Sequence, residues 1–281
     1  MTFCRMHMAA LLPLLFVAAA LGQQPKWITV PALRQVSTGI GTITADIDSR
    51  LPATRNQYTF GSDVYRHAQT AIWAHEAAHG VNSRIRNQYG DGTGTDNGFY
   101  VLHGVGTIIK EPTPLRFTTI GRQCPRALRG RIYQLYMVEQ ARVWDKQPLN
   151  IVDEWTAYVN GSFQTLENIH KGRGAGDGKY DALMSLETGV YTLVVARAIA
   201  MGLHDGTLTY DDNQFRYYVA WHWWRTRKLV ERAERAPTAM GGNPKGYIRT
   251  FQRSRDPAVA NLRDWTQVYF GKEWCRAILG I

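Results

Sequence analysis

The segment from His75 to His79 reads His-Glu-Ala-Ala-His, and it constrains the fold of this chain more than any other stretch. In an α-helix, residues i and i+4 lie on the same face, so a helix here brings the two imidazole rings together. Glu76 then lies beside the rings, close enough to act on a water molecule held by a metal ion. The spacing therefore predicts a helix that supplies two metal ligands and a neighbouring carboxylate.

The residues around this segment favour a helix. Ser62 or Asp63 is a suitable N-cap, and no Pro or Gly interrupts the chain from Asp63 to His79. Apolar residues and the two histidines then follow one another at helical spacing: Val64, Ala68, Ile72, His75 and His79. We expect a helix over residues 63–86, with both imidazoles facing inward into the floor of a cleft.

A catalytic zinc centre needs a third protein ligand. Glu154 is the first candidate, because Asn150 can cap a helix whose first turn carries two carboxylates, Asp153 and Glu154. Asp96 is a second candidate, although it lies in a Gly-, Asp- and Asn-rich run of the kind that commonly forms a turn. Asp153 itself and His103 are the remaining possibilities.

This arrangement resembles the gluzincin group of zincin metallopeptidases, in which one helix gives two histidines and a later helix gives a glutamate. The resemblance covers two short segments. It implies His75, His79 and Glu154 as zinc ligands and Glu76 as the general base. It also implies an α+β fold that is predominantly helical, with a small sheet beside the motif helix.

Two other zincin subclasses match less well. Metzincins require a Gly and a third His at the positions that Asn82 and Ile85 occupy in this chain, so that subclass is excluded. The run around Asp96 resembles the Gly-Thr loop from which aspzincins supply an aspartate, but it lies farther from His79 than that loop would. Glu154 remains the preferred third ligand.

A zinc ion in such a site lowers the pKa of bound water to about 7, and Glu76 would take its proton and pass it to the leaving amine. The developing oxyanion needs a further donor. Tyr158, Tyr100 and His103 are the candidates, and we select Tyr158. A zinc-bound imidazole usually donates its other N–H to a carboxylate or carbonyl group, a role that Asp153 can fill.

The first residues of the chain have the features of a secretory signal peptide. Arg5 gives a positive n-region, the apolar core runs over residues 9–21, and small residues precede a cleavage point after Gly22. We expect residues 1–22 to be removed. Residues 23–281 then form a single zincin-like catalytic domain that is secreted or periplasmic.

Only Cys124 and Cys275 remain after that cleavage. In an exported protein this even pair is expected to form one disulfide, and two buried thiols are the alternative. Neither cysteine lies in a Cys-x-x-Cys arrangement, which argues against a redox centre or a cysteine-based zinc site.

The rest of the chain predicts a small sheet with a helical bulk. Extended segments are expected at residues 27–30 and 41–47, and one or two strands at 97–109, where an edge strand can pair with a substrate. The glycine-rich run 171–178 is interpreted as a surface connection. Helices are expected over residues 125–144, 151–170, 180–201, 212–236 and 257–279.

The exported chain is basic, because losing residues 1–22 removes only Arg5 from a formal charge of +10 and leaves +9. Much of this charge follows an aromatic run at residues 217–225. We interpret that segment as a helix with a core face and a solvated face, since no motif indicates specific nucleic-acid binding. The charge favours nonspecific attraction to anionic cell-envelope polymers.

The sequence therefore predicts a secreted, monomeric zinc metallopeptidase that acts on a peptide or protein substrate. Two other classes stay open. One is a secreted non-peptidase, meaning a hydrolase of another amide or an inactive zincin scaffold that binds envelope material. The other is a structural envelope protein in which the His-Glu-Ala-Ala-His pattern is accidental.

Overall fold

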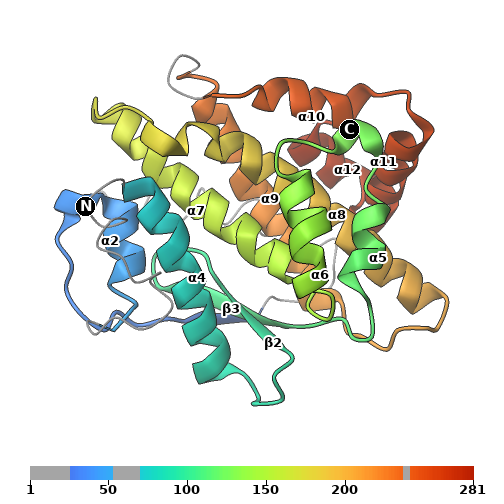
Figure 1. The fold of residues 1–281 in the computed structure, drawn as a ribbon, viewed down its shortest axis with the longest axis horizontal. Coiled ribbons are helices and arrows are strands. Elements are labelled where there is room, and N and C mark those ends of the chain that lie inside the picture. The colour runs from blue at the N-terminus through green and yellow to red at the C-terminus, as the bar shows by residue number, and fades with distance from the viewer. Residues whose placement is uncertain (1–25, 53–69, 237–240) are drawn as a thin grey trace.

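The computed structural model describes residues 26–52, 70–236 and 241–281, which form a small sheet beside a large group of helices (Figure 1). The predicted class, α+β and predominantly helical, is confirmed at that level. The proposed signal peptide and the expected caps of the motif helix, Ser62 and Asp63, lie outside the described residues.

The sheet has three antiparallel strands in the order β1-β3-β2. Its strands are β1 (Trp27–Thr29), β2 (Asp96–Tyr100) and β3 (Val105–Lys110). β2 and β3 are joined by a tight turn in which Leu102 and His103 have positive φ and Gly104 follows them. The strands expected near residues 27–30 and within 97–109 are both present.

Helix α4 (Thr70–Tyr89) carries the His-Glu-Ala-Ala-His segment and packs against α7 (Asn150–His170) and the sheet (Figure 1). Small residues let the two helices approach closely. A Cβ atom added at Gly161 of α7 would lie 3.2 Å from the carbonyl oxygen of Ala71 and 3.3 Å from the Cβ of His75. This close approach brings side chains from the two helices to a common point.

The helical bulk lies behind α7 and consists mainly of α8 (Asp181–His204) and α9 (Asn213–Ala233). Trp223 of α9 is buried, and its ring centroid lies 5.5 Å from that of Trp155 on α7. Lys228, on the same helix, is exposed. The helix has the expected core face and solvated face, but Arg225 lies in the core instead of on the solvated face.

Helix α8 belongs to the stretch Gly178–His204, which is apolar and long enough to cross a membrane by length and composition alone. However, 78% of its most apolar window is buried inside the molecule. Burial of this kind is typical of a core helix.

The segment 41–47, expected to be extended, instead forms helix α2 (Thr42–Asp48). Two side chains of α7 stabilise its first turn. The carboxylate of Glu167 accepts a hydrogen bond from the backbone N–H of Thr42, and Gln164 Oε1 accepts one from the N–H of Thr44 at 3.0 Å. These partners are more than a hundred residues away, so the local pattern could not indicate them.

The continuous helix expected over residues 125–144 is also wrong. After α5 (Phe117–Arg122), the chain forms a 3₁₀ turn, a seven-residue π-helix and a short α-helix: Arg126–Leu128, Gln134–Gln140 and α6 (Ala141–Val143). The buried carboxylate of Glu187 accepts hydrogen bonds at 2.9 Å from the backbone N–H groups of Arg131 and Ile132. This distant partner holds the chain in an irregular path.

The C-terminal region contains one helix that we did not expect, α10 (Pro244–Arg253). The side chain of Asn243 caps it by accepting a hydrogen bond from the N–H of Gly246 at 2.8 Å, a signal present in the Asn-Pro pair. The single helix expected at 257–279 is divided by Gly271, which has a φ of 91°. Its parts are α11 (Pro257–Phe270), α12 (Lys272–Trp274) and the π-helix Cys275–Leu279.

The predicted disulfide is wrong, because Cys124 and Cys275 are both free and buried. The thiol of Cys275 lies 3.4 Å from the carbonyl oxygen of Thr266, and that of Cys124 lies 3.8 Å from the carbonyl oxygen of Pro125. Burial raises the pKa of each thiol to about 12. Both cysteines therefore behave as small core residues.

Candidate metal centre

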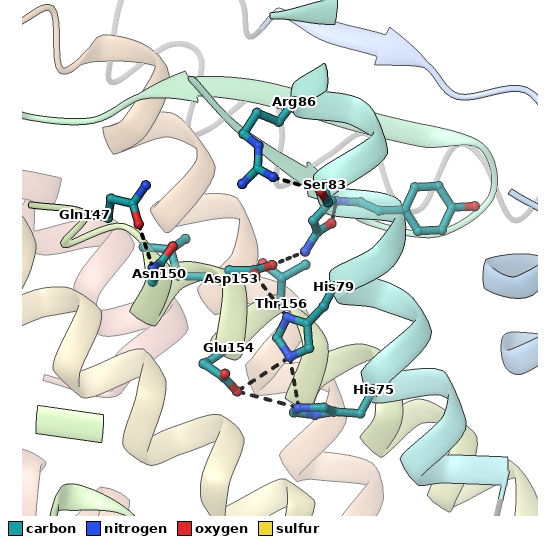
Figure 2. A network of polar contacts seen from close by, with 12 residues as sticks. His75, His79, Ser83, Arg86, Gln147, Asn150, Asp153, Glu154 and Thr156 are labelled. Carbon is teal, nitrogen blue, oxygen red and sulfur yellow. Dashed lines mark hydrogen bonds and ion pairs between the residues drawn. The ribbon is translucent and has the colours of Figure 1, made fainter. Parts of the chain in front are cut away.

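Three side chains from two helices converge between α4 and α7 (Figure 2). His75 and His79 extend from one face of α4, and their Nε2 atoms are 3.2 Å apart. Glu154 extends toward them from the start of α7, with Oε2 3.5 Å from Nε2 of His75 and 3.7 Å from Nε2 of His79. Within the described part of the chain, no other group of three His, Cys, Asp or Glu side chains is clustered this closely.

The three atoms fit a single zinc ion. Ligand atoms bound at about 2.0–2.1 Å and at tetrahedral angles lie about 3.3–3.4 Å apart, close to the separations found here. Glu154 Oε2 is also buried without a hydrogen bond from any described residue. A buried carboxylate oxygen without a hydrogen bond is costly, and a bound cation would remove that cost.

The charges around the site favour a cation. Burial lowers the pKa of His79, but the negative charges of Asp153, Glu154 and Glu76 outweigh this effect and raise it to about 10. Burial similarly raises the pKa of Glu154, but the interactions of its carboxylate with His79 and His75 outweigh the effect of burial and hold that pKa below its usual value. Near neutral pH and without metal, a proton on His79 therefore supplies the positive charge that a metal ion would bring.

Asp153 fixes the orientation of His79. Its Oδ2 atom accepts a hydrogen bond from Nδ1 of His79 at 2.9 Å (Figure 2). With Nδ1 as the donor, Nε2 of the neutral ring carries the lone pair and faces His75 and Glu154. Asp153 thus occupies the role expected of a carboxylate behind a ligating imidazole, on the opposite side of the ring from the convergence point.

The start of α7 differs in one detail from the sequence expectation. Leu149 is the N-cap residue and Asn150 is the first residue of the helix, so the Asn150 side chain does not cap it. Instead, the buried carboxylate of Glu111 accepts a hydrogen bond from the N–H of Leu149 at 3.2 Å. Burial raises the pKa of Glu111 to about 8.

Glu76 lies next to His75 on α4 and is partly buried. Its negative charge contributes to the raised pKa of His79 and to that of Tyr158. Glu76 is therefore close enough to affect both groups electrostatically.

Two tyrosines lie beside the cluster of His75, His79 and Glu154. The ring of Tyr158 packs edge-on against His75 at a centroid distance of 4.4 Å, and its hydroxyl is 2.9 Å from that of Tyr136. Burial and the charge of Glu154 raise the pKa of both phenols, so both stay protonated and can donate hydrogen bonds. We selected Tyr158 from the sequence and missed Tyr136, because Tyr136 reaches this place only through the irregular π-helix.

Asp96 does not join this group. Its Oδ2 atom accepts a hydrogen bond from the N–H of Asp91 at 2.6 Å, and its Oδ1 atom lies 3.3 Å from Nζ of Lys110. Asp96 therefore stabilises the loop before β2, which is the turn role that the sequence offered as the alternative.

Tyr100 and His103 are also engaged elsewhere. The Tyr100 hydroxyl donates to Oδ2 of Asp46 at 2.8 Å and accepts hydrogen bonds from Arg50 and Gly104. His103 is exposed in the turn between β2 and β3. The geometry therefore supports neither residue as the oxyanion donor and does not support His103 as a ligand.

The edge of β2 is not open to a substrate, contrary to our expectation. All five residues of β2 are buried. At its end, Asn82 Oδ1 accepts a hydrogen bond from the N–H of Tyr100, and Asn160 Nδ2 donates one to the Tyr100 carbonyl. Side chains of α4 and α7 thus occupy backbone groups of Tyr100 that a bound peptide would have needed.

Comparisons with known proteins found no matching family model, no matching curated protein and no matching solved structure.

Proposed function

We propose that this protein is a secreted zinc-dependent metallopeptidase. One observation carries the proposal: Oε2 of Glu154 is buried, accepts no hydrogen bond from any residue that the structure describes, and lies within 3.7 Å of the Nε2 atoms of His75 and His79. Two imidazoles and one carboxylate are the ligand set that zinc has in many catalytic sites, where the fourth position stays open.

The proposed roles of the residues combine these positions with the resemblance to gluzincins. His75, His79 and Glu154 would hold a zinc ion, whose Lewis acidity would make water nucleophilic near neutral pH and polarise a carbonyl group. Glu76 accepts the proton of the attacking water and passes it to the leaving amine. Tyr158 donates a hydrogen bond to the oxygen on which negative charge develops.

A second function is favoured by the covered edge of β2. An extended peptide usually gains affinity by pairing with an exposed strand, and the described residues offer no such pairing at Tyr100. A hydrolase of a compact amide does not need it. Turnover of long peptides compared with small amide substrates distinguishes the two functions.

Zinc content tests the ligand set. The purified wild type is expected to hold one zinc per chain, and Glu154→Ala is expected to lose it. Asp96→Ala is the matched control, because it removes a buried carboxylate that is outside the proposed site. Zinc that is retained by Glu154→Ala, or absent from the wild type, would contradict the proposal.

Glu76→Gln tests the chemistry separately from metal binding. The variant is expected to keep its zinc and lose turnover on a quenched peptide library, because the amide cannot accept the proton. Equal hydrolysis by the variant and the wild type would rule out this role.

Export is tested by the N-terminus of the protein recovered from outside the cytoplasm. We expect it to begin at Gln23, since residues 1–22 have the features of a cleaved signal. Recovery of the uncleaved chain in the cytoplasm alone would contradict this.

A further inference from the structure

We propose that Asn82 is a positioning residue for the metal centre, holding Asp153 and through it the imidazole of His79. This inference rests on the proposed function, because it concerns the same site. Asn82 does not touch the convergence point. It lies one helical turn beyond His79 on α4, and its side chain is buried.

The contact that carries the inference joins α4 to α7. Asn82 Nδ2 donates a hydrogen bond to Oδ1 of Asp153, while Oδ2 of the same carboxylate accepts from Nδ1 of His79. Both oxygens of Asp153 are therefore held, one by the imidazole and one by the amide. Without Asn82, the Asp153 carboxylate could rotate about its Cβ–Cγ bond and lose its hydrogen bond to His79.

The amide of Asn82 is itself held in one orientation. Its Oδ1 atom accepts a hydrogen bond from the backbone N–H of Tyr100 at 2.6 Å. A flipped amide would place its oxygen against the Asp153 carboxylate and its NH₂ group against the Tyr100 N–H, which loses both contacts. The assignment of donor and acceptor therefore follows from the network.

The backbone of Tyr100 is fixed in turn. Its carbonyl accepts a hydrogen bond from Nδ2 of Asn160 at 2.9 Å, and Asn160 Oδ1 accepts one from Nη2 of Arg225 at 3.0 Å. Asn160 and Arg225 are both buried, and no described carboxylate forms an ion pair with Arg225. Side chains of α7 and α9 thus anchor the end of β2, and β2 anchors Asn82.

This arrangement accounts for the covered edge of β2. The backbone groups that could have bound a substrate are used to support the metal centre. It also accounts for a polar residue in a buried position of α4, where an apolar side chain would pack at lower cost.

The substitution Asn82→Asp tests the contact with little change in volume. An aspartate can still accept from the Tyr100 N–H, but as a carboxylate it repels Asp153 instead of donating to it. Asn82→Ala removes both contacts and serves as the second variant. The matched control is Asn97→Asp, because Asn97 is a buried amide whose Nδ2 donates at 2.7 Å to a different buried acidic side chain, Glu111.

Zinc affinity is measured by competition with a chromophoric chelator. We expect Asn82→Asp and Asn82→Ala to weaken it by up to about 10-fold, the low end of the range for partners of a ligand, because Asn82 acts through Asp153. Asn97→Asp should leave zinc affinity unchanged. In a double-mutant cycle, Asn82→Asp should have little further effect once Asp153 is replaced by Ala. Affinity within twofold of the wild type in both Asn82 variants, or independent effects in the cycle, would overturn the inference.

A measurement without metal separates this inference from the proposed function. Nitrogen-15 spectra of the metal-free protein should show a hydrogen-bonded Nδ1–H of His79 in the wild type and in Asn97→Asp. That signal should shift or disappear in Asn82→Asp. If the wild type binds no zinc, the proposed function fails, whereas an unchanged His79 signal in Asn82→Asp refutes the positioning role on its own.

Discussion

Replacing Asp153 by Asn should weaken zinc binding by about 10- to 100-fold. The carboxylate accepts hydrogen bonds from His79 Nδ1 and Asn82 Nδ2 with its two oxygens. An asparagine has a single oxygen, so it satisfies one of these donors and turns its NH₂ group toward the other. The change is close to isosteric, which confines its effect to hydrogen bonding.

Two independent magnitudes agree for this substitution. A hydrogen bond to a charged group contributes about 1.5–3 kcal/mol, and loss of a carboxylate behind a ligating imidazole costs about 10- to 100-fold in metal affinity, or about 1.4–2.7 kcal/mol. The loss should appear in the dissociation constant for zinc. It should be smaller than the loss in Glu154→Ala, which removes a proposed ligand.

The assay is a chelator competition titration, with the melting temperature of the metal-free protein measured in parallel. Asp145→Asn is the control, because the Asp145 side chain is 32% exposed, against 28% for Asp153, and accepts two hydrogen bonds from Thr118 outside the site. Zinc affinity should be unchanged in the control. An Asp153→Asn protein with wild-type zinc affinity would refute the orientation of His79 by this carboxylate.

Three further results are expected. Gly161→Ala should weaken zinc binding, because the new methyl group would lie 3.2 Å from the Ala71 carbonyl oxygen and 3.3 Å from the Cβ of His75 and would displace α4. Its effect on stability should be small, since alanine favours the helix by about 1 kcal/mol. Unchanged zinc affinity by titration would contradict this. The raised pKa of His79, about 10, stabilises the metal-free fold fully below pH 6.5, and this contribution is lost as the ring deprotonates. The free energy of unfolding should therefore fall between pH 6.5 and about 10, by at most about 1.4 kcal/mol per pH unit. Denaturant titrations of the wild type and His79→Gln would show it, and equal pH slopes would oppose it. Finally, Cys124 and Cys275 should resist alkylation in the folded protein, and both should react after unfolding without a reductant. Detection of a Cys124–Cys275 disulfide by mass spectrometry would contradict this.

The sequence indicated the parts of the site that depend on local geometry. The spacing of His75 and His79 requires only a helix, and Glu154 requires only a second helix that faces the first. The position of Asp153 behind an imidazole also followed from the ordinary needs of a zinc ligand.

What the sequence did not indicate depends on contacts between distant segments. Helix α2 is capped by Glu167 of α7, and the irregular segment that carries Tyr136 is held by Glu187 of α8. The disulfide was expected because an exported protein meets an oxidising environment, whereas each thiol is buried in a different part of the core. In the sequence, Asn82 serves only to exclude the metzincin motif, since its partners Asp153 and Tyr100 meet it only in the folded chain.

X-ray absorption at the zinc edge is the most direct test of the metal centre. The wild-type protein loaded with one equivalent of zinc should show two imidazole nitrogens at about 2.0–2.1 Å and oxygen ligands at about 2.0–2.2 Å, and Glu154→Ala should lose an oxygen ligand or the metal itself. A spectrum with sulfur ligands, or with a first shell of water and no imidazole scattering, would contradict convergence of His75, His79 and Glu154 on one ion.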